Sequence, residues 1–284
     1  MNKDMFITKA SGEKSLFSEK KLSSSLQRAG ATEDQINSII AEISSQLFEG
    51  MTTKNIYRLA FKRLRENSRP LAARYNLKQA IMELGPSGFP FEKYVSKILN
   101  HQGYKTKIGE IVKGKCVSHE IDVIAEKENN FFMIECKYHN LPGIFCDVKI
   151  PLYIESRFRD VEAEWMKLPG HDLKTHQGWV VTNTRFSTDA LQYGICAGLN
   201  LLGWDYPINA GLRDQIDSLG LYPITCLTSL TKVEKQRLLD KGIILCKEIY
   251  NEEKILVASG VKPSRILTVM KEAQQLCKDL ILKK

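Results

Sequence analysis

The sequence between residues 119 and 137 contains two runs, His119-Glu120-Ile121-Asp122-Val123-Ile124-Ala125-Glu126-Lys127 and Phe131-Phe132-Met133-Ile134-Glu135-Cys136-Lys137. Apolar residues alternate with others in the first run, and residues that favour β-structure dominate the second, so both runs are predicted strands. The charged segment between them ends in Asn-Asn, which favours a turn. The stretch therefore predicts a β-hairpin with strands over residues 121–125 and 131–136.

Three charged residues of this hairpin are unusual for a plain pair of strands. Asp122 stands inside an apolar run, although a half-buried carboxylate is costly unless a partner compensates its charge. Glu135 and Lys137 are two residues apart on a strand, so their side chains point to the same face, and Asp122 can face Glu135 from the neighbouring strand. Two carboxylates with the main-chain carbonyl of Cys136 can hold Mg²⁺ or Mn²⁺ and leave waters in place.

Lys137 completes a set of groups suited to phosphodiester hydrolysis. Its ammonium can orient or help to deprotonate an attacking water, or stabilise the negative charge that develops on a phosphate. A metal ion with such a lysine suffices for in-line cleavage, so the hairpin predicts a metal-dependent nuclease. The alternative is a surface salt bridge between Asp122 and Lys137. Such a pair would add little stability and would not explain why an aspartate stands inside an apolar strand.

The residues on both sides of the hairpin predict a mixed sheet flanked by helices. The predicted elements are, in order, a helix over residues 91–100, a strand over 103–112, the hairpin, a helix over 147–165, a strand over 178–183, a helix over 188–199 and a strand over 201–204. The first helix is amphipathic, and Glu92 lies off its apolar face. Two Gly and two Pro within residues 85–90 predict a linker before it.

This order of elements, with Asp122, Glu135 and Lys137 in the pattern Asp-(x)n-Glu-x-Lys, resembles the restriction-endonuclease-like fold and its Mrr-type (type IV) branch. The resemblance spans residues 91–207 and includes Glu92, since many members carry a carboxylate on the leading helix. It implies a catalytic domain over residues 87–210 that cleaves double-stranded DNA with Mg²⁺ or Mn²⁺. Glu92 would reach the metal through water or hold a second ion. The implied catalytic residues are Asp122, Glu135, Lys137 and Glu92.

The first 84 residues predict a small β-hairpin followed by four helices. Strands are predicted over residues 5–9 and 15–17, and helices over 19–29, 33–48, 53–66 and 71–84. Ser18 and Thr32 are the predicted N-caps of the first two helices.

This N-terminal segment resembles the ATP-cone domain, best known as the nucleotide-sensing module of ribonucleotide reductases. The matching residues are Ile7-Thr8-Lys9-Ala10-Ser11-Gly12, Phe17, Lys21-Leu22, Thr53-x-x-Ile56 and Ala72-Ala73-Arg74-Tyr75. The resemblance implies a domain over residues 1–86 that binds ATP or dATP as an allosteric ligand. The nucleotide would lie near Lys9, Ser15 to Lys21, and Thr53.

Lysines near a turn and a helix N-terminus suit a triphosphate. Ala10 stands where the family usually has arginine, which removes one phosphate contact. The chain has no Gly-x-x-x-x-Gly-Lys-Ser/Thr loop, so ATP would be a regulator and not a fuel.

A third predicted domain, residues 211–284, is mostly helical. Helical segments are predicted over residues 232–241, 245–250 and 264–280, with a turn at Ser259-Gly260-Val261-Lys262-Pro263. A helix, a short Gly-containing turn and a helix resemble helix-hairpin-helix modules, in which main-chain N–H groups bind DNA phosphates. The resemblance places Lys241, Lys262 and Arg265 near the DNA backbone. Its glycine pattern is incomplete, and a helical tail that only packs is the alternative.

The composition favours a polyanionic partner and a reducing compartment. Lys and Arg number 41 against 33 Asp and Glu, a formal net charge of +8. The seven cysteines lack paired spacing, which argues against a disulfide framework and a structural zinc site. His119, Cys136 and His139 are interpreted as neighbours of a carboxylate site and not as ligands of a soft metal. No apolar run approaches the roughly 18 residues that a membrane span needs, and no signal-peptide core follows the N-terminus, so we expect a cytoplasmic protein without membrane contact.

Together these patterns predict a mixed α+β chain that is a metal-dependent DNA endonuclease regulated by ATP or dATP. The main alternative is a non-catalytic, ATP-responsive regulator that binds DNA, and the intact set of Asp122, Glu135 and Lys137 favours the enzyme. A junction resolvase would share the core chemistry but would act on another substrate and require a dimer. ATP cones and nucleases of this fold often act as oligomers, so a homo-oligomer fits either function.

Overall fold

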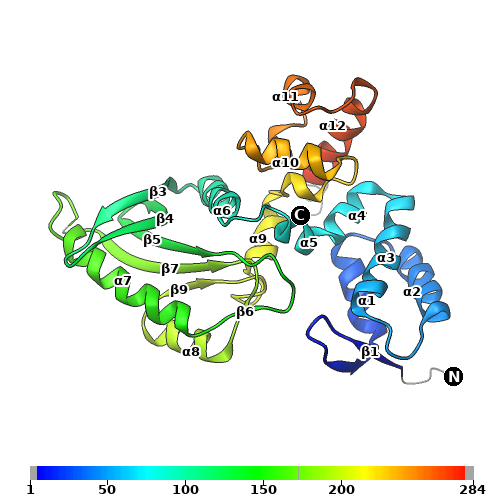
Figure 1. The fold of residues 1–284 in the computed structure, drawn as a ribbon, viewed down its shortest axis with the longest axis horizontal. Coiled ribbons are helices and arrows are strands. Elements are labelled where there is room, and N and C mark those ends of the chain that lie inside the picture. The colour runs from blue at the N-terminus through cyan, green and yellow to red at the C-terminus, as the bar shows by residue number, and fades with distance from the viewer. Residues whose placement is uncertain (1–4, 172, 279–284) are drawn as a thin grey trace. The chain divides into compact units, whose positions relative to one another are not determined.

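The computed structural model describes residues 5–171 and 173–278, which divide into two compact units (Figure 1). Unit 1 combines the described residues up to Ile81 with those from Tyr222 onward, and unit 2 is Met82–Leu221. Unit 2 is therefore inserted into the chain between the two parts of unit 1. The division into domains over 1–86, 87–210 and 211–284 stays a prediction, since compactness alone does not tell which segments fold independently.

The N-terminal part of unit 1 is the predicted hairpin followed by helices. Its elements are β1 (Phe6–Thr8), β2 (Lys14–Leu16), α1 (Glu19–Arg28), α2 (Glu33–Gln46), α3 (Thr53–Asn67), α4 (Arg69–Tyr75) and α5 (Leu77–Met82). Both predicted N-caps are confirmed: the Ser18 hydroxyl accepts from the Lys21 N–H, and Thr32 forms a capping box with Gln35. The apolar faces of α1, α2 and α3 meet in one buried core.

The helix predicted over residues 71–84 is instead two helices, α4 and α5. Asn76 ends α4, and its side-chain carbonyl accepts a hydrogen bond from the Tyr57 hydroxyl. Asparagine has a low helix propensity, and at this position its side chain bonds a tyrosine of α3, so a helix end at Asn76 is favoured over a continuous helix.

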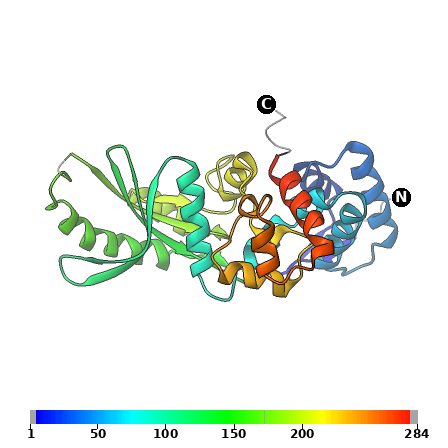
Figure 2. The ribbon, with the colours of Figure 1, turned by 90° about the horizontal axis from the view of Figure 1, so that it is seen from above.

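The C-terminal part of unit 1 is helical, as predicted, and packs against the N-terminal part. Its elements are the 3₁₀ turns η1 (Ile224–Cys226) and η2 (Cys246–Glu248), and the helices α10 (Lys232–Asp240), α11 (Glu253–Ala258) and α12 (Pro263–Lys278). Helix α12 contacts α4 (Figure 2). The Thr225 hydroxyl donates to the carbonyl of Ala80 at 2.7 Å, and Arg74 donates to the carbonyl of Leu276 at 3.5 Å. The predicted end of α12 at Leu280 lies outside the described residues.

Unit 2 is built on a five-stranded mixed sheet in the order β3-β4-β5-β7-β9. Its strands are β3 (Lys105–Lys113), β4 (Ser118–Lys127), β5 (Asn130–Lys137), β7 (Thr175–Thr182) and β9 (Asn200–Leu202), and a small second sheet joins β6 (Phe145–Cys146) to β8 (Arg185–Phe186). The first three strands are antiparallel, while β5, β7 and β9 are parallel. The predicted hairpin is confirmed, but its connection is tighter than expected because Lys127 already pairs with Asn130.

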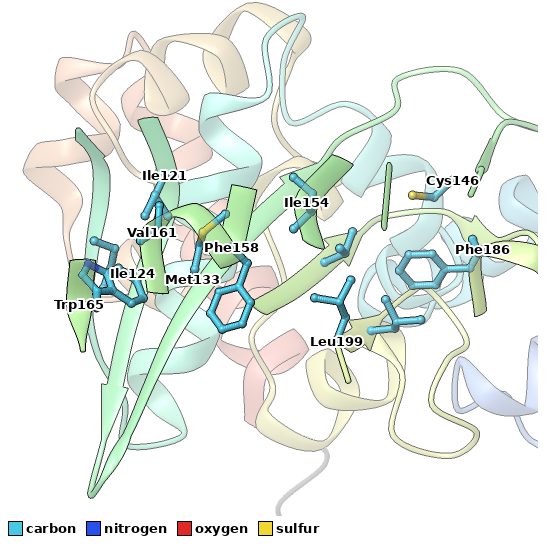
Figure 3. Close-up of a cluster of buried hydrophobic side chains, with 13 residues drawn as sticks. Ile121, Ile124, Met133, Cys146, Ile154, Phe158, Val161, Trp165, Phe186 and Leu199 are labelled. Atoms are coloured by element: carbon cyan, nitrogen blue, oxygen red, sulfur yellow. The ribbon is translucent and has the colours of Figure 1, made fainter. Parts of the chain in front are cut away.

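Helices cover both faces of this sheet. Helix α6 (Phe89–His101) lies on one face, and α7 (Lys149–Trp165) and α8 (Thr188–Cys196) lie on the other (Figure 1). The main core fills the space beneath α7, where Ile154, Phe158 and Trp165 meet apolar residues of β4 and β5 (Figure 3). This packing fixes α7 against the hairpin that carries Asp122 and Glu135.

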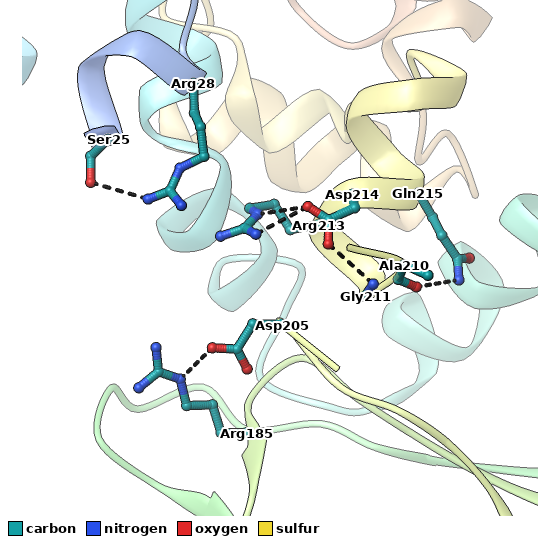
Figure 4. Close-up of polar contacts among 9 residues, drawn as sticks. All are labelled: Ser25, Arg28, Arg185, Asp205, Ala210, Gly211, Arg213, Asp214 and Gln215. Atoms are coloured by element: carbon teal, nitrogen blue, oxygen red, sulfur yellow. Dashed lines mark hydrogen bonds and ion pairs between the residues drawn. The ribbon is translucent and has the colours of Figure 1, made fainter. Parts of the chain in front are cut away.

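Helix α9 (Leu212–Leu219) was not predicted from the sequence. The carboxylate of Asp214 accepts from the Gly211 N–H at 3.1 Å, and the Gln215 side chain donates to the carbonyl of Ala210 at 3.1 Å (Figure 4). These contacts close the first turn of a helix too short to show clear periodicity. The predicted fold class, a mixed α+β chain with a hairpin, a central mixed sheet and a helical C-terminal region, is confirmed. None of the helices described is long and apolar enough to cross a bilayer.

Candidate active site and nucleotide pocket

Asp122 lies where the pairing of β4 with β5 ends. The last paired residues are Val123 and Ile134, so the register brings Asp122 opposite Glu135. Beyond this point the carboxylate Oδ2 of Asp122 accepts a hydrogen bond of 2.7 Å from the main-chain N–H of Cys136. The Asp122 side chain thus takes the place of a backbone hydrogen bond between the strands, and this bond holds Asp122 at the end of β5.

Three carboxylates gather at this end of the sheet from three elements. Glu92 comes from α6, Asp122 from β4 and Glu135 from β5. Burial raises the pKa of Glu135 to about 7, and the negative charge of Asp122 adds to the effect. Burial also raises the pKa of Glu92 to about 7, and the charges of Asp122, Glu120 and Glu135 contribute to this. Carboxyl groups that perturb one another in this way are typical of functional sites.

Two cations face the carboxylates. The Arg157 guanidinium, from α7, donates from Nη1 to Oε2 of Glu135 at 2.8 Å and from Nη2 to the main-chain carbonyl of Glu120. The positive charge of Lys137 lowers the pKa of Asp122 and of Glu135, although burial outweighs it in both cases. The structure therefore brings the four predicted catalytic residues Glu92, Asp122, Glu135 and Lys137 into one electrostatic cluster. Sequence reasoning did not single out Arg157, whose contact joins distant parts of the chain.

The segment that follows Lys137 is held by buried polar side chains. The Thr182 hydroxyl donates to the main-chain carbonyl of Lys137 at 2.8 Å. The side chain of Asn183 accepts from the N–H of His139 at 2.8 Å and donates to its carbonyl at 2.7 Å. Thr182 is fully buried and Asn183 nearly so. The sequence placed these residues on a strand but gave no sign of their contacts.

The donor groups at the site are those that a hard cation prefers. Asp122, Glu135 and the main-chain carbonyl of Cys136 would offer oxygen atoms, which suit Mg²⁺ or Mn²⁺. Burial keeps the pKa of the Cys136 thiol well above its usual value. Within residues 5–171 and 173–278, no three His, Cys, Asp or Glu side chains converge as ready ligands of one ion.

His119 lies close in sequence to the hairpin, but its ring serves another contact. Its Nε2 lies 2.7 Å from Oδ2 of Asp160 on α7. The same carboxylate accepts from the main-chain N–H groups of Cys116 and Val117, at 2.7 and 3.3 Å. Asp160 thus ties the turn between β3 and β4 to α7.

A pocket of about 220 Å³ lies in unit 1 between the β1–β2 hairpin, α1, α3 and α4. All four residues predicted to contact a nucleotide line it, namely Lys9, Ser15, Lys21 and Thr53. The two lysines and the hydroxyl groups of Ser15, Ser18 and Ser25 make one part of its wall polar. The pocket therefore offers both positive charge and hydrogen-bond donors to an anionic group.

Aromatic residues form another part of the pocket wall. Tyr57 and Tyr75 stack with ring centroids 5.2 Å apart and an interplanar angle of 10°. Burial raises the pKa of Tyr75 to about 12, so this ring stays neutral at physiological pH. Sequence reasoning included Tyr75 in a family motif but missed Tyr57. A pocket lined by both aromatic rings and lysines suits a ligand with a planar base and a phosphate chain.

The three residues predicted to contact DNA have different surroundings in the C-terminal part of unit 1. Lys241 and Lys262 are exposed, next to the glycine turns that follow α10 and α11. Arg265 is used within the protein, because its guanidinium pairs with the buried Glu234 at 2.6 Å and donates to the Ser229 carbonyl. Arg265 is thus engaged by internal partners, and its contact with DNA stays a prediction.

Comparison with known families identifies the N-terminal segment as an ATP cone. The ATP cone domain matches residues 5–79, as the sequence predicted, and its range includes every residue that lines the pocket. The C-terminal domain of AF1548-like proteins matches residues 222–277. These two matched ranges fall in the two chain segments that together form unit 1.

The chain belongs to the AF1548-like family. An uncharacterized protein of Archaeoglobus fulgidus is 36% identical over 184 residues, which are 64% of this chain and 99% of that protein. The crystal structure of AF1548, a protein of unknown function, is 35% identical with a TM-score of 0.56, and the match covers 67% of this chain and 98% of that one. Neither relative is described by an activity, so the chemistry of unit 2 must be argued from its own residues.

Proposed function

We propose that unit 2 is a metal-dependent DNA endonuclease whose activity responds to the nucleotide bound by the ATP cone. The observation that carries this proposal is the cluster of Glu92, Asp122 and Glu135 with Lys137 at one end of the β4–β5 hairpin. Three carboxylates at a half-buried site repel one another, and this repulsion destabilises the fold. Such clusters are typical of sites where the carboxylates bind a cation or take part in a reaction.

Each residue has a distinct part in this proposal. Asp122 and Glu135, with the Cys136 carbonyl, would hold Mg²⁺ or Mn²⁺, which supplies Lewis acidity and an activated water when bound. Lys137 would orient that water or stabilise charge on the phosphate. Thr182 and Asn183 fix the chain on which Lys137 stands, which keeps the lysine in place. Glu92 would act through water or hold a second ion.

The cone would make this activity responsive to ATP or dATP. Its pocket combines Lys9 and Lys21 with the stacked Tyr57 and Tyr75, which suits a triphosphate and a base. Double-stranded DNA is the proposed substrate, consistent with the net charge of +8. Exposed Lys241 and Lys262 would contact its backbone without reading sequence.

One observation favours a second candidate, a non-catalytic DNA-binding regulator that responds to ATP. Arg157 already pairs with Glu135, so one oxygen of a proposed metal ligand is engaged by a protein cation. In such a regulator the ion pair would be permanent. The enzyme remains the stronger proposal because an ion pair with Glu135 gives no reason for Glu92 and Asp122 to lie beside it.

The experiment compares cleavage of methylated and unmodified plasmids with Mg²⁺ or Mn²⁺, with and without ATP or dATP. Wild-type protein should cut in a metal-dependent way, and Lys137→Ala should lose cleavage while it still binds DNA. Lys149→Ala is the matched control, because this exposed lysine begins α7. If wild-type protein bound DNA but was as inert as Lys137→Ala and Asp122→Ala under every condition, the regulator would be the better description.

A further inference from the structure

Arg157 joins α7 to both strands of the hairpin at the proposed active site. Its Nη1 donates to Oε2 of Glu135 on β5 at 2.8 Å, and its Nη2 donates to the main-chain carbonyl of Glu120 on β4. The side chains of Arg157 and Glu135 are only 12% and 19% exposed. A guanidinium held at two points in a sheltered site has a fixed orientation, and it imposes one on the carboxylate that it contacts.

The hydrogen bonding of Arg157 differs from that expected of an ion pair that only stabilises the fold. The Nε of Arg157 is buried, and it has no hydrogen-bond partner among the described residues. An unsatisfied buried donor costs free energy, so this placement of the guanidinium is not the one that would best stabilise the fold. Burying an ion pair also costs desolvation, which its attraction only partly recovers. The arrangement therefore favours a role for Arg157 in placing Glu135.

Arg159 provides a contrast on the same helix. It pairs with Glu155 and Glu162 at 2.8 and 2.9 Å, but its side chain is 57% exposed and both partners lie on α7 itself. Such pairs along a helix surface add little to stability. Arg157 instead reaches across to the sheet. Arg157 therefore contacts the carboxylate cluster, whereas Arg159, two residues further along the same helix, does not.

The contact uses one oxygen of Glu135 and leaves the other. Arg157 binds Oε2, and in the described part of the chain Oε1 receives no hydrogen bond. Asp122 lies opposite Glu135 in the register of β4 and β5, and its carboxylate bonds the N–H of Cys136, the residue after Glu135. We propose that Arg157 is a positioning residue, which locks the Glu135 side chain by Oε2 so that Oε1 is held ready for a divalent cation shared with Asp122.

This inference rests on the proposed function, because it assigns Arg157 to the metal site of the proposed nuclease. It concerns binding of the cation and not the chemical step. Residues that orient a metal ligand by hydrogen bonding typically change metal affinity by about 10- to 100-fold when they are removed. Arg157→Ala should therefore weaken Mn²⁺ binding by this factor. Arg157→Lys, which keeps the charge but loses the two-point contact, should recover only part of it.

The test is calorimetric titration of full-length wild type, Arg157→Ala, Arg157→Lys and Arg159→Ala with Mn²⁺, alongside cleavage rates at limiting and saturating Mn²⁺. The expected result is weaker Mn²⁺ binding by the two Arg157 variants and unchanged binding by Arg159→Ala. Cleavage by Arg157→Ala should recover largely at saturating Mn²⁺, which a general loss of structure would not allow. Thermal unfolding of each variant checks folding, and Arg157→Lys carries the test if Arg157→Ala does not fold.

Two outcomes would overturn the inference while the proposed function stands. Wild type would bind Mn²⁺ and cleave DNA, and the Arg157 variants would bind Mn²⁺ either as tightly as wild type or more tightly. Tighter binding would mean that the guanidinium competes with the cation for Glu135. If wild type neither bound Mn²⁺ nor cleaved DNA, the proposed function would fail, and the role of Arg157 would fail with it.

Discussion

The main-chain N–H of Cys136 donates a hydrogen bond of 2.7 Å to the carboxylate of Asp122. This bond takes the place of a strand-to-strand rung, since β4 and β5 pair only as far as Val123 and Ile134. The hairpin is thus open at the end that carries the proposed site. Asp122 is anchored through Oδ2, and within the residues that the structure describes its Oδ1 receives no hydrogen bond.

Asp122→Asn should abolish metal-dependent cleavage and leave the fold intact. The amide oxygen of asparagine can still accept from Cys136 N–H, so the hairpin keeps its anchor, but the charge that attracts a cation is gone. We expect Mn²⁺ affinity to fall by at least about tenfold, with the free energy of unfolding at neutral pH unchanged or higher. Calorimetry, plasmid cleavage and urea denaturation measure these quantities. Asp122→Asn that still cleaves DNA at the wild-type rate would contradict a metal-binding role.

Asn183→Ala should destabilise unit 2 strongly. The Asn183 side chain makes two hydrogen bonds to the main chain of His139 from a position that is 1% exposed. Removing it leaves a buried N–H and a buried carbonyl without partners, which together cost about 2 to 4 kcal/mol. Urea denaturation measures the loss, and Asn129→Ala, at the exposed turn between β4 and β5, is the control with an expected change within about 0.5 kcal/mol. A similarly small change for Asn183→Ala would show that these two hydrogen bonds do not stabilise unit 2.

The carboxylate cluster should make stability depend on pH. Burial, with the charge of Asp122, raises the pKa of Glu135 to about 7, against the opposing charges of Arg157 and Lys137. A carboxyl whose pKa is raised in the folded state holds its proton while the unfolded chain has already released it. Its contribution to stability is therefore fully present below about pH 4.5 and is lost as the pH rises through about 7.

Glu135→Gln removes this dependence, because glutamine does not titrate. With chelator present, the unfolding free energy of the variant relative to wild type should increase between pH 5 and pH 8, on the order of 2 kcal/mol. Urea denaturation at both pH values gives the difference, and other titrating groups cancel in the comparison. A difference between variant and wild type that stays constant with pH would mean that Glu135 is ionised throughout this range.

The sequence predicted the features that depend on local pattern. Alternation of apolar residues predicted the hairpin, and the Asp inside it marked the proposed site. N-caps at Ser18 and Thr32 were visible because capping needs only residues three apart. The four residues predicted to contact a nucleotide came from a family resemblance, and the fold brings them together around one cavity.

What the sequence could not predict depends on contacts between distant segments. Arg157 reaches Glu135 only because the core under α7 sets how that helix is rotated on the sheet. Asn183 is polar yet nearly fully buried, and its partner is a backbone 44 residues away. The C-terminal helices join the N-terminal segment in unit 1 across an insertion of 140 residues, Met82–Leu221. No local pattern encodes any of these relations.

The lysines of the cone pocket should govern nucleotide affinity. Lys21 lines the pocket, while its neighbour Lys20 is exposed on α1 and does not. Removing a charge that contacts phosphate should weaken ATP binding about five- to tenfold and make binding less sensitive to salt. Calorimetry of Lys21→Ala with ATP tests this, with Lys20→Ala as the matched control. Equal losses in both variants would point to general electrostatic attraction instead of a contact.

Nucleotide binding should also slow amide hydrogen exchange in the C-terminal helices of unit 1. Tyr75 lines the pocket, and the preceding residue Arg74, on the same helix α4, donates to the carbonyl of Leu276 on α12. A ligand that orders α4 should therefore slow amide hydrogen exchange in α12 as well as around the pocket. Hydrogen exchange with and without ATP measures this, and Arg74→Ala should confine the slowing to the pocket. If ATP slowed exchange at the pocket of the wild type but left exchange in α12 unchanged, the contact between Arg74 and Leu276 would not couple the two regions.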